Sequence, residues 1–114
     1  MRSTQSHFPG RPGKRLTLLM SVHDHVRHTS LQLEVLKRAR RAKLAGATVF
    51  EGVEGFGTSG RVHREHVISD DRPLAIVLVD RPERIDAFLE SIAPLLDGVA
   101  VTVDDVEMLD EWGS

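Results

Sequence analysis

The alternation of hydrophobic and polar positions predicts a chain built mainly from four strands and two helices. Residues 15–22 carry apolar side chains at every second position, which is typical of a strand with one buried face. Residues 47–53 contain β-branched and aromatic residues and predict the second strand. Residues 74–79 are continuously apolar, so we expect a strand buried on both faces. The last predicted strand covers residues 99–108, and residues 61–69 suit the returning arm of a hairpin.

Two further segments have apolar residues at helical spacing. The first predicted helix covers residues 30–45, with Thr29 as its cap and Gly46 in the left-handed position after its end. The second begins after Asp80, which is expected to cap it, and ends at Pro94 and Gly98. The apolar rows that define the two helices are Leu31, Val35, Leu36, Ala39 and Ala42, and Ile85, Phe88, Leu89, Ile92 and Leu96.

The predicted order is β-α-β-β-α-β, which indicates an α+β fold, the ferredoxin-like βαββαβ sandwich with an antiparallel sheet. Two helices cover only one face of such a sheet, yet the third strand is apolar on both faces and Leu19 adds an apolar residue to the other side of the first. We therefore expect the helix-free face to be buried against copies of the same chain, in a ring of three. The expected organisation is a flexible arm (1–13), one domain (14–110) and a tail (111–114).

Composition excludes several classes of protein. The chain has no Cys, which excludes disulfides and thiolate zinc sites. It has no apolar run close to the roughly 20 residues of a membrane-spanning helix. Its first residues lack the apolar segment of a signal peptide. A soluble, cytoplasmic protein is the expectation.

Charge is distributed unevenly along the chain. Residues 1–84 hold all 15 Lys and Arg against nine Asp and Glu, a net charge of +6. Residues 85–114 hold eight acidic residues and no basic one. This asymmetry indicates either an anion-binding half or complementary surfaces that solvate the protein or pair between subunits.

The most distinctive stretch is EGVEGFGTSGRVHREH at residues 51–66. Its glycines permit close backbone approach, and successive N–H groups in such a segment can hold an anion. Arg61 and Arg64 supply guanidinium groups suited to phosphate or carboxylate. The alternative is a bulged, flexible hairpin with solvated charges.

Four histidines form a second candidate site. His23 and His25 follow the first predicted strand, and His63 and His66 lie on the predicted hairpin arm. The fold can bring these segments together, and neutral imidazoles are ligands for zinc, copper or nickel. The spacing matches no known zinc motif, so a metal-binding or metal-tolerance trimer is kept as the alternative function, beside surface histidines with no ligand.

Catalysis and nucleic-acid binding are not expected. No nucleophile, base and orienting group can be recognised from their spacing, and the chain has no Asn to help an oxyanion. The first predicted helix is basic, but aromatic residues for stacking on bases do not accompany it.

Several short motifs resemble one known family. They are Gly46–Val49, Gly52–Gly57, His63, Arg72–Pro73 and Val79–Asp80. These residues are similar to those of the family called domain of unknown function one-ninety, whose members are PII-like, resembling the nitrogen-regulatory PII signalling proteins. The Gly52–Gly57 run, GVEGFG, is the most specific of the matches.

The resemblance implies a homotrimeric regulatory protein and not an enzyme. In PII-like proteins a small ligand, often an adenine nucleotide, binds in clefts between subunits, and a loop that here corresponds to residues 54–66 contacts a partner. Family association suggests a fluoride exporter of the membrane as that partner. No basic residue follows Arg84, so a phosphate would depend on Arg61, Arg64 or Arg72, on backbone N–H groups of the loop, or on Lys and Arg of the first predicted helix. The predicted ligand residues are Gly55, Phe56, Gly57, Arg61, His63 and Arg64.

Overall fold

The computed structural model describes residues 10–53 and 72–109. Within these ranges the elements follow the predicted order of strands and helices, with one short hairpin added after the first strand. The elements are β1 (Arg11–Ser21), β2 (His25–Val26), β3 (Thr29–Ser30), α1 (Leu31–Arg41), β4 (Ala47–Glu51), β5 (Pro73–Asp80), α2 (Pro82–Ile92), the 3₁₀ helix η2 (Ala93–Leu95) and β6 (Ala100–Met108).

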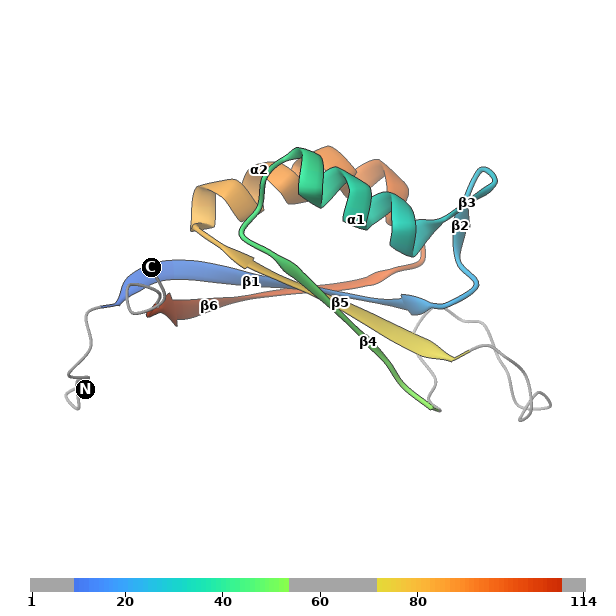
Figure 1. The fold of residues 1–114 in the computed structure, drawn as a ribbon, viewed down its shortest axis with the longest axis horizontal. Helices are drawn as coiled ribbons and strands as arrows, with labels where there is room; N and C mark the ends of the chain where they lie inside the picture. Colours follow the sequence, from blue (N-terminus) through green and yellow to red (C-terminus); the bar gives the residue numbers. More distant parts are fainter. Residues whose placement is uncertain (1–9, 54–71, 110–114) are drawn as a thin grey trace.

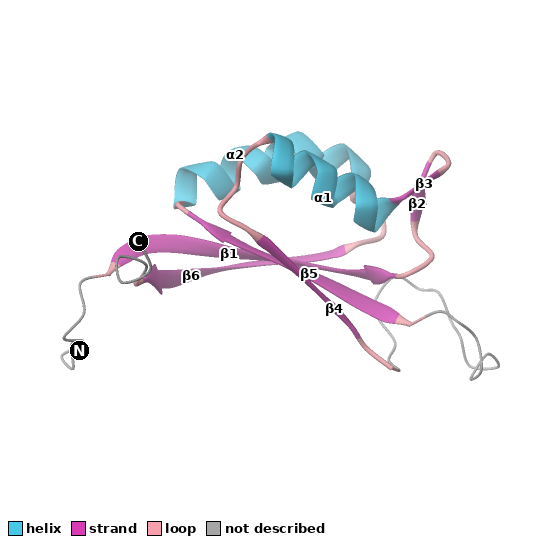
Figure 2. Cartoon of the chain, viewed as in Figure 1, coloured by secondary structure: helices cyan, strands magenta, loops and turns pink. Residues whose placement is uncertain are grey.

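The main sheet has the strand order β4-β5-β1-β6, and every neighbouring pair is antiparallel. Both helices lie on the same side of this sheet (Figure 1). Figure 2 shows the two layers in contrasting colours, with the β2–β3 hairpin beside the start of α1. The predicted α+β, ferredoxin-like arrangement is confirmed.

The core lies between the sheet and the helices. Alternate residues of the two central strands meet across the ladder: Leu16 faces Leu78, and Leu18 faces Ile76. All four side chains are fully buried. Their period of two follows from the pleat of a strand. The sequence pattern correctly assigned Leu16 and Leu18 to one face, whereas the continuous apolar run of residues 74–79 did not distinguish the face of Ile76 and Leu78. The remaining buried apolar residues are Met20, Leu31, Val35, Ala39, Leu74, Ile85, Phe88 and Ile92.

The opposite, helix-free face of the sheet exposes apolar side chains. Phe50, Ala75, Leu19 and Ala100 form one row across the four strands, because each lies directly opposite the next in the ladder. Phe50 is 59% exposed and Leu19 is 47% exposed in the single chain. The expected apolar character of this face is therefore present in the folded protein.

Helix α1 begins and ends differently from the prediction. Its N-cap is Ser30, whose hydroxyl accepts a hydrogen bond from the Leu33 N–H, while Thr29 pairs with Val26 in the small hairpin. The helix ends at Arg41, and Lys43, with φ of 60°, takes the left-handed position that was assigned to Gly46. The prediction for Thr29 was wrong because β3 extends through Ser30 and the helix begins only at Leu31. The prediction for Gly46 was wrong because the chain turns at Lys43, three residues earlier.

Helix α2 also begins one residue later than expected. Arg81 is its N-cap and makes no side-chain capping bond, so Asp80 does not cap it in the predicted way. Asp80 instead ends β5 and points its carboxylate towards other elements. Gly98, with φ of 81°, makes the turn before β6, a conformation that favours glycine.

Strand β1 is longer than predicted. It begins at Arg11 because its first residues pair with the end of β6, Arg11 opposite Met108 and Gly13 opposite Val106. Strand β4 is shorter than predicted and ends at Glu51. In the described parts of the chain, no helix combines the length and the apolar character needed to cross a membrane.

Candidate functional site

The predicted ligand residues lie in the connection between β4 and β5. Gly55, Phe56, Gly57, Arg61, His63 and Arg64 all fall within residues 54–71, outside the described residues, as does His66. Their assignment stays a prediction. The structure does describe the two ends of this connection, where β4 stops and β5 begins.

These two ends are joined by backbone and side-chain contacts. The Gly52 N–H donates to the Pro73 carbonyl at 2.8 Å. A Cβ on Gly52 would lie 2.8 Å from the Pro73 Cγ, so a larger residue here requires the proline ring or the strand to shift. Beside this bond, the Arg72 guanidinium lies 3.5 Å from a Glu51 carboxylate oxygen, with both side chains about half exposed. We call this set (Glu51, Gly52, Arg72 and Pro73) the loop base.

The end of β1 also meets the loop base. The Val22 N–H donates to the Arg72 carbonyl at 3.0 Å. This contact continues the β1–β5 ladder. The expected approach of the segment after the first strand to the hairpin arm stays a prediction, because residues 61–69 lie outside the described residues. A turn follows at once, in which Asp24 accepts from the Ser21 N–H at 3.0 Å through its carboxylate. His23 in this turn directly follows Val22, whose N–H makes the contact to the loop base.

The histidines of this turn do not form a metal site with one another. The His25 ring Nδ1 lies against the His23 carbonyl, so this ring is directed at its own backbone. In residues 10–53 and 72–109 no group of three or more His, Asp or Glu side chains could hold a metal ion. Because His63 and His66 lie outside these ranges, the four-histidine site stays a prediction.

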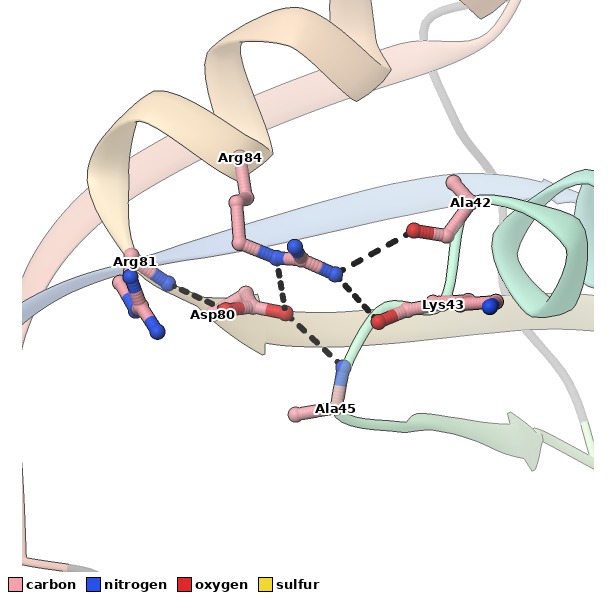
Figure 3. A network of polar contacts seen from close by, with 6 residues as sticks. All are labelled: Ala42, Lys43, Ala45, Asp80, Arg81 and Arg84. Atoms are coloured by element: carbon pink, nitrogen blue, oxygen red, sulfur yellow. Dashed lines mark hydrogen bonds and ion pairs between the residues drawn. The ribbon is translucent and has the colours of Figure 1, made fainter.

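A buried carboxylate joins three elements at the other end of β4. Asp80, only 6% exposed, accepts hydrogen bonds from the Ala45 N–H at 2.8 Å and the Arg81 N–H at 2.7 Å. The Arg84 Nε donates to the same carboxylate at 3.2 Å (Figure 3). The Arg84 Nη2 also donates to the carbonyls of Ala42 and Lys43, just beyond α1. We call this network the corner clasp; it ties α1, β4 and α2 together.

The clasp stabilises the ionised form of Asp80. Burial opposes ionisation, but the two backbone N–H donors and the Arg84 guanidinium outweigh it and hold the pKa of Asp80 below its ordinary value. The carboxylate is therefore ionised near neutral pH and has no proton to donate there. It acts as a charged anchor. Its role in the described structure is to position the start of β4.

The sequence analysis did not predict the contacts that form the corner clasp and the loop base. Asp80 and Arg84 are four residues apart, the spacing of a helical ion pair, and that signal could have linked them. Nothing in the sequence links Asp80 to Ala45, which lies 35 residues away. The pairing of Glu51 with Arg72 likewise depends on the register of β4 and β5.

The family follows from comparison with known proteins. The model of DUF190, the domain of unknown function one-ninety, described as an uncharacterized ACR, matches residues 13–108. The chain belongs to this family. A curated relative, the UPF0166 protein of Aquifex aeolicus (strain VF5), is 32% identical over 77 residues, which cover 66% of this chain and 72% of the relative.

Solved structures show the same fold. CPII of Thiomonas intermedia K12, a nitrogen regulatory PII-like protein bound to ADP, AMP and bicarbonate, gives a TM-score of 0.67 at 19% identity, covering 90% of this chain and 92% of that chain. The apo form of CPII gives a TM-score of 0.60 at 19% identity, covering 89% and 96%. At this identity the likeness concerns the fold, and it confirms the PII-like architecture of this DUF190 protein.

Proposed function

We propose that this DUF190 protein is a PII-like, non-enzymatic regulatory protein that binds a small anionic ligand between its subunits. The adenine nucleotides seen with CPII suggest the ligand class. The observation that carries the proposal is the loop base: on a PII-like fold, β4, β5 and the end of β1 converge where the Gly-rich connection begins.

Subunit association is part of this proposal. The helix-free face exposes Leu19 and Phe50 in one apolar row with Ala75 and Ala100. Burying apolar surface contributes about 25 cal/mol per Å² to association, before the entropic cost of association is subtracted. A closed ring of three copies would cover this face in every subunit and create clefts between them.

The ligand would bind beside the loop base. Gly55, Gly57 and Phe56 would supply backbone N–H groups and a ring, and Arg61, His63 and Arg64 would supply positive charge. Binding would shift the population of loop conformations and so change contact with a partner through residues 54–66. Within a cell, the fluoride exporter suggested by the resemblance would be met at the cytoplasmic side of the membrane.

Calorimetry with ADP, AMP, ATP, cyclic AMP and bicarbonate tests this proposal. We expect heat from at least one adenine nucleotide, and slower hydrogen exchange at Gly52 and Val22 on binding, because both amides belong to the junction beside the loop. Arg61→Gln or Arg64→Gln should weaken affinity by roughly tenfold to a hundredfold, since a charge-assisted hydrogen bond contributes about 1.5–3 kcal/mol. Arg38→Gln is the matched control, because Arg38 pairs with Glu34 on α1. Absence of heat with every nucleotide at millimolar concentration would refute nucleotide binding.

A further inference from the structure

Arg72 is a cation fixed to the fold at the point where β5 begins. Its carbonyl accepts from the Val22 N–H at 3.0 Å, and the carbonyl of the next residue, Pro73, accepts from the Gly52 N–H at 2.8 Å. Pro73 then enters the β5 ladder opposite Ser21 of β1. The backbone that carries the guanidinium is therefore held on one side by the end of β1 and on the other by the end of β4.

The guanidinium itself is held loosely. It lies 3.5 Å from a carboxylate oxygen of Glu51, and the two side chains are 47% and 48% exposed. Charge-assisted hydrogen bonds from an arginine to a carboxylate are normally about 2.7–2.9 Å long. The pair is thus an attraction between two hydrated charges, which contributes little to stability. An oxyanion that offers two oxygens at hydrogen-bonding distance would bind Arg72 more strongly than Glu51 does.

Other arginines of the described structure are paired more closely. The ion pairs of Arg15, Arg38 and Arg84 measure 2.6, 2.8 and 3.2 Å. Arg38 also donates through its Nε to the Glu34 carboxylate, which is only 18% exposed. Of these four arginines, Arg72 has the longest ion pair, so a competing anion displaces its carboxylate with the smallest loss.

Both side chains of this pair lie off the face through which the copies are proposed to associate. Glu51 is opposite Leu74 in the ladder, and Leu74 is buried in the core between the sheet and the helices. Arg72 precedes Leu74 by two residues and so continues the same face of the strand. The pair also lies towards an edge of the sheet, because β4 is the last strand in the order. Covering the helix-free face would therefore leave Arg72 accessible at the edge of the subunit.

We infer that Arg72 binds an oxyanion of the ligand and that Glu51 occupies its guanidinium in the free protein. A phosphate or carboxylate group of the ligand takes the place of the Glu51 carboxylate. This inference rests on the proposed function and adds to it a ligand residue whose place in the fold is described. Because Glu51 is the last residue of β4, its release removes one contact that holds the end of this strand. Ligand binding is thereby coupled to the strand that leads into the Gly-rich connection.

Two substitutions at this pair should change ligand affinity in opposite directions. The probe is ADP, or the adenine nucleotide that binds the native chain most tightly. Arg72→Gln should raise its dissociation constant by about tenfold to a hundredfold, because a charged donor is lost. Glu51→Gln should lower the dissociation constant by about two- to fivefold, because the competing carboxylate is gone. Calorimetry at one fixed ionic strength measures both changes, since salt screens exposed charges.

The ion pair of α1 supplies the matched controls. Arg38→Gln and Glu34→Gln make the same changes of charge in a pair that is four residues apart on one helix. Neither substitution should alter the affinity for the nucleotide. Melting of each variant verifies that the subunit remains folded.

A double substitution separates displacement of Glu51 from general repulsion. A carboxylate near the site lowers the affinity for any anion, with or without Arg72. If Glu51 acts by occupying the guanidinium, the gain from Glu51→Gln should disappear in the Arg72→Gln background. A gain that persists in that background, or an affinity that falls with Glu51→Gln alone, overturns the inference.

The remaining outcomes distinguish this inference from the proposed function. If the nucleotide binds Arg72→Gln as tightly as the native chain, the role of Arg72 is overturned and the proposed function stands. If the native chain binds no nucleotide, the proposed ligand class is refuted, and inorganic pyrophosphate then tests Arg72 by itself. We expect pyrophosphate to shift the NMR signal of the Arg72 Nε–H, identified by its loss in Arg72→Gln, and to leave the Arg38 signal in place. An Arg72 signal that moves no more than the Arg38 signal overturns the inference.

Discussion

Both ends of β4 are held by an acid and an arginine, but the two pairs differ in their surroundings. At the start of the strand, Asp80 is 6% exposed and accepts from Ala45, Arg81 and Arg84. At its end, Glu51 and Arg72 are about half exposed and 3.5 Å apart. A buried carboxylate with three donors resists opening, whereas an exposed ion pair contributes little.

The difference suggests how a ligand could act. The corner clasp keeps the start of β4 in place relative to both helices (Figure 3). At the other end, the loop base adds to the β4–β5 ladder one backbone bond, from Gly52 to Pro73, and an exposed ion pair. A ligand beside the connection could therefore move the end of β4 without disturbing the core.

The largest expected effect is a difference in stability between two variants in which a carboxylate is replaced by an amide. Asp80→Asn places an NH₂ group among the donors of Ala45 and Arg84, and should lower the free energy of unfolding by about 2–3 kcal/mol. Glu51→Gln, the matched change at the loop base, should cost less than about 0.5 kcal/mol because that pair is exposed. Urea unfolding measures the free energy of unfolding of both variants. If the two variants lose the same amount, the corner clasp does not stabilise the fold more than the loop base.

A smaller effect is expected from two glycine substitutions. Gly52→Ala would place a Cβ 2.8 Å from the Pro73 Cγ, and should cost about 1–2 kcal/mol because the ring or the strand must shift. Gly46→Ala meets nothing within 4 Å and should leave stability unchanged or raise it by up to about 1 kcal/mol. Thermal melting compares the two. If Gly52→Ala is as stable as Gly46→Ala, the close approach at the loop base is wrong.

The smallest expected effect is a dependence of the stability of the fold on pH. The pKa of Asp80 is lowered in the folded state, so its ionisation stabilises the fold fully above the unfolded value of about 3.9. That contribution is lost as the pH falls through the lower folded pKa. The stability difference between the native chain and Asp80→Asn should therefore narrow in acid. If the stability difference between the native chain and Asp80→Asn is the same at pH 7 and pH 2.5, the ionisation of Asp80 does not stabilise the fold.

The sequence predicted the elements well and their ends less well. Alternation placed Leu16, Leu18 and Met20 on the buried face of β1, and helical spacing placed Ile85 and Phe88 in the core, because these periods are set by local backbone geometry. Caps were less predictable. Thr29 and Ser30 are adjacent residues of the same chemistry and both pair in the β2–β3 hairpin, but Ser30, which directly precedes Leu31, caps α1.

In the candidate site, too, some features can be predicted from the sequence and others cannot. The expected approach of His23 and His25 to the hairpin arm stays a prediction, because the arm lies outside the described residues. The binding of Asp80 to Ala45 could not be expected, since no local pattern relates residues so distant in sequence. The assignments of Arg61, His63 and Arg64 depend on the sequence and the family resemblance.

The sequence by itself determined the buried face of β1, most of the buried positions of the two helices, the order of strands and helices, and the separation of basic and acidic halves. Only the tertiary structure decided that Asp80 would join α1, β4 and α2, and that the acids of β6 would lie at the sheet edge opposite β4. The physical reason is the distance along the chain over which each property is set. Periodicity records the environment of neighbouring residues, whereas a hydrogen bond or a charged surface depends on distances that exist only after remote segments have packed.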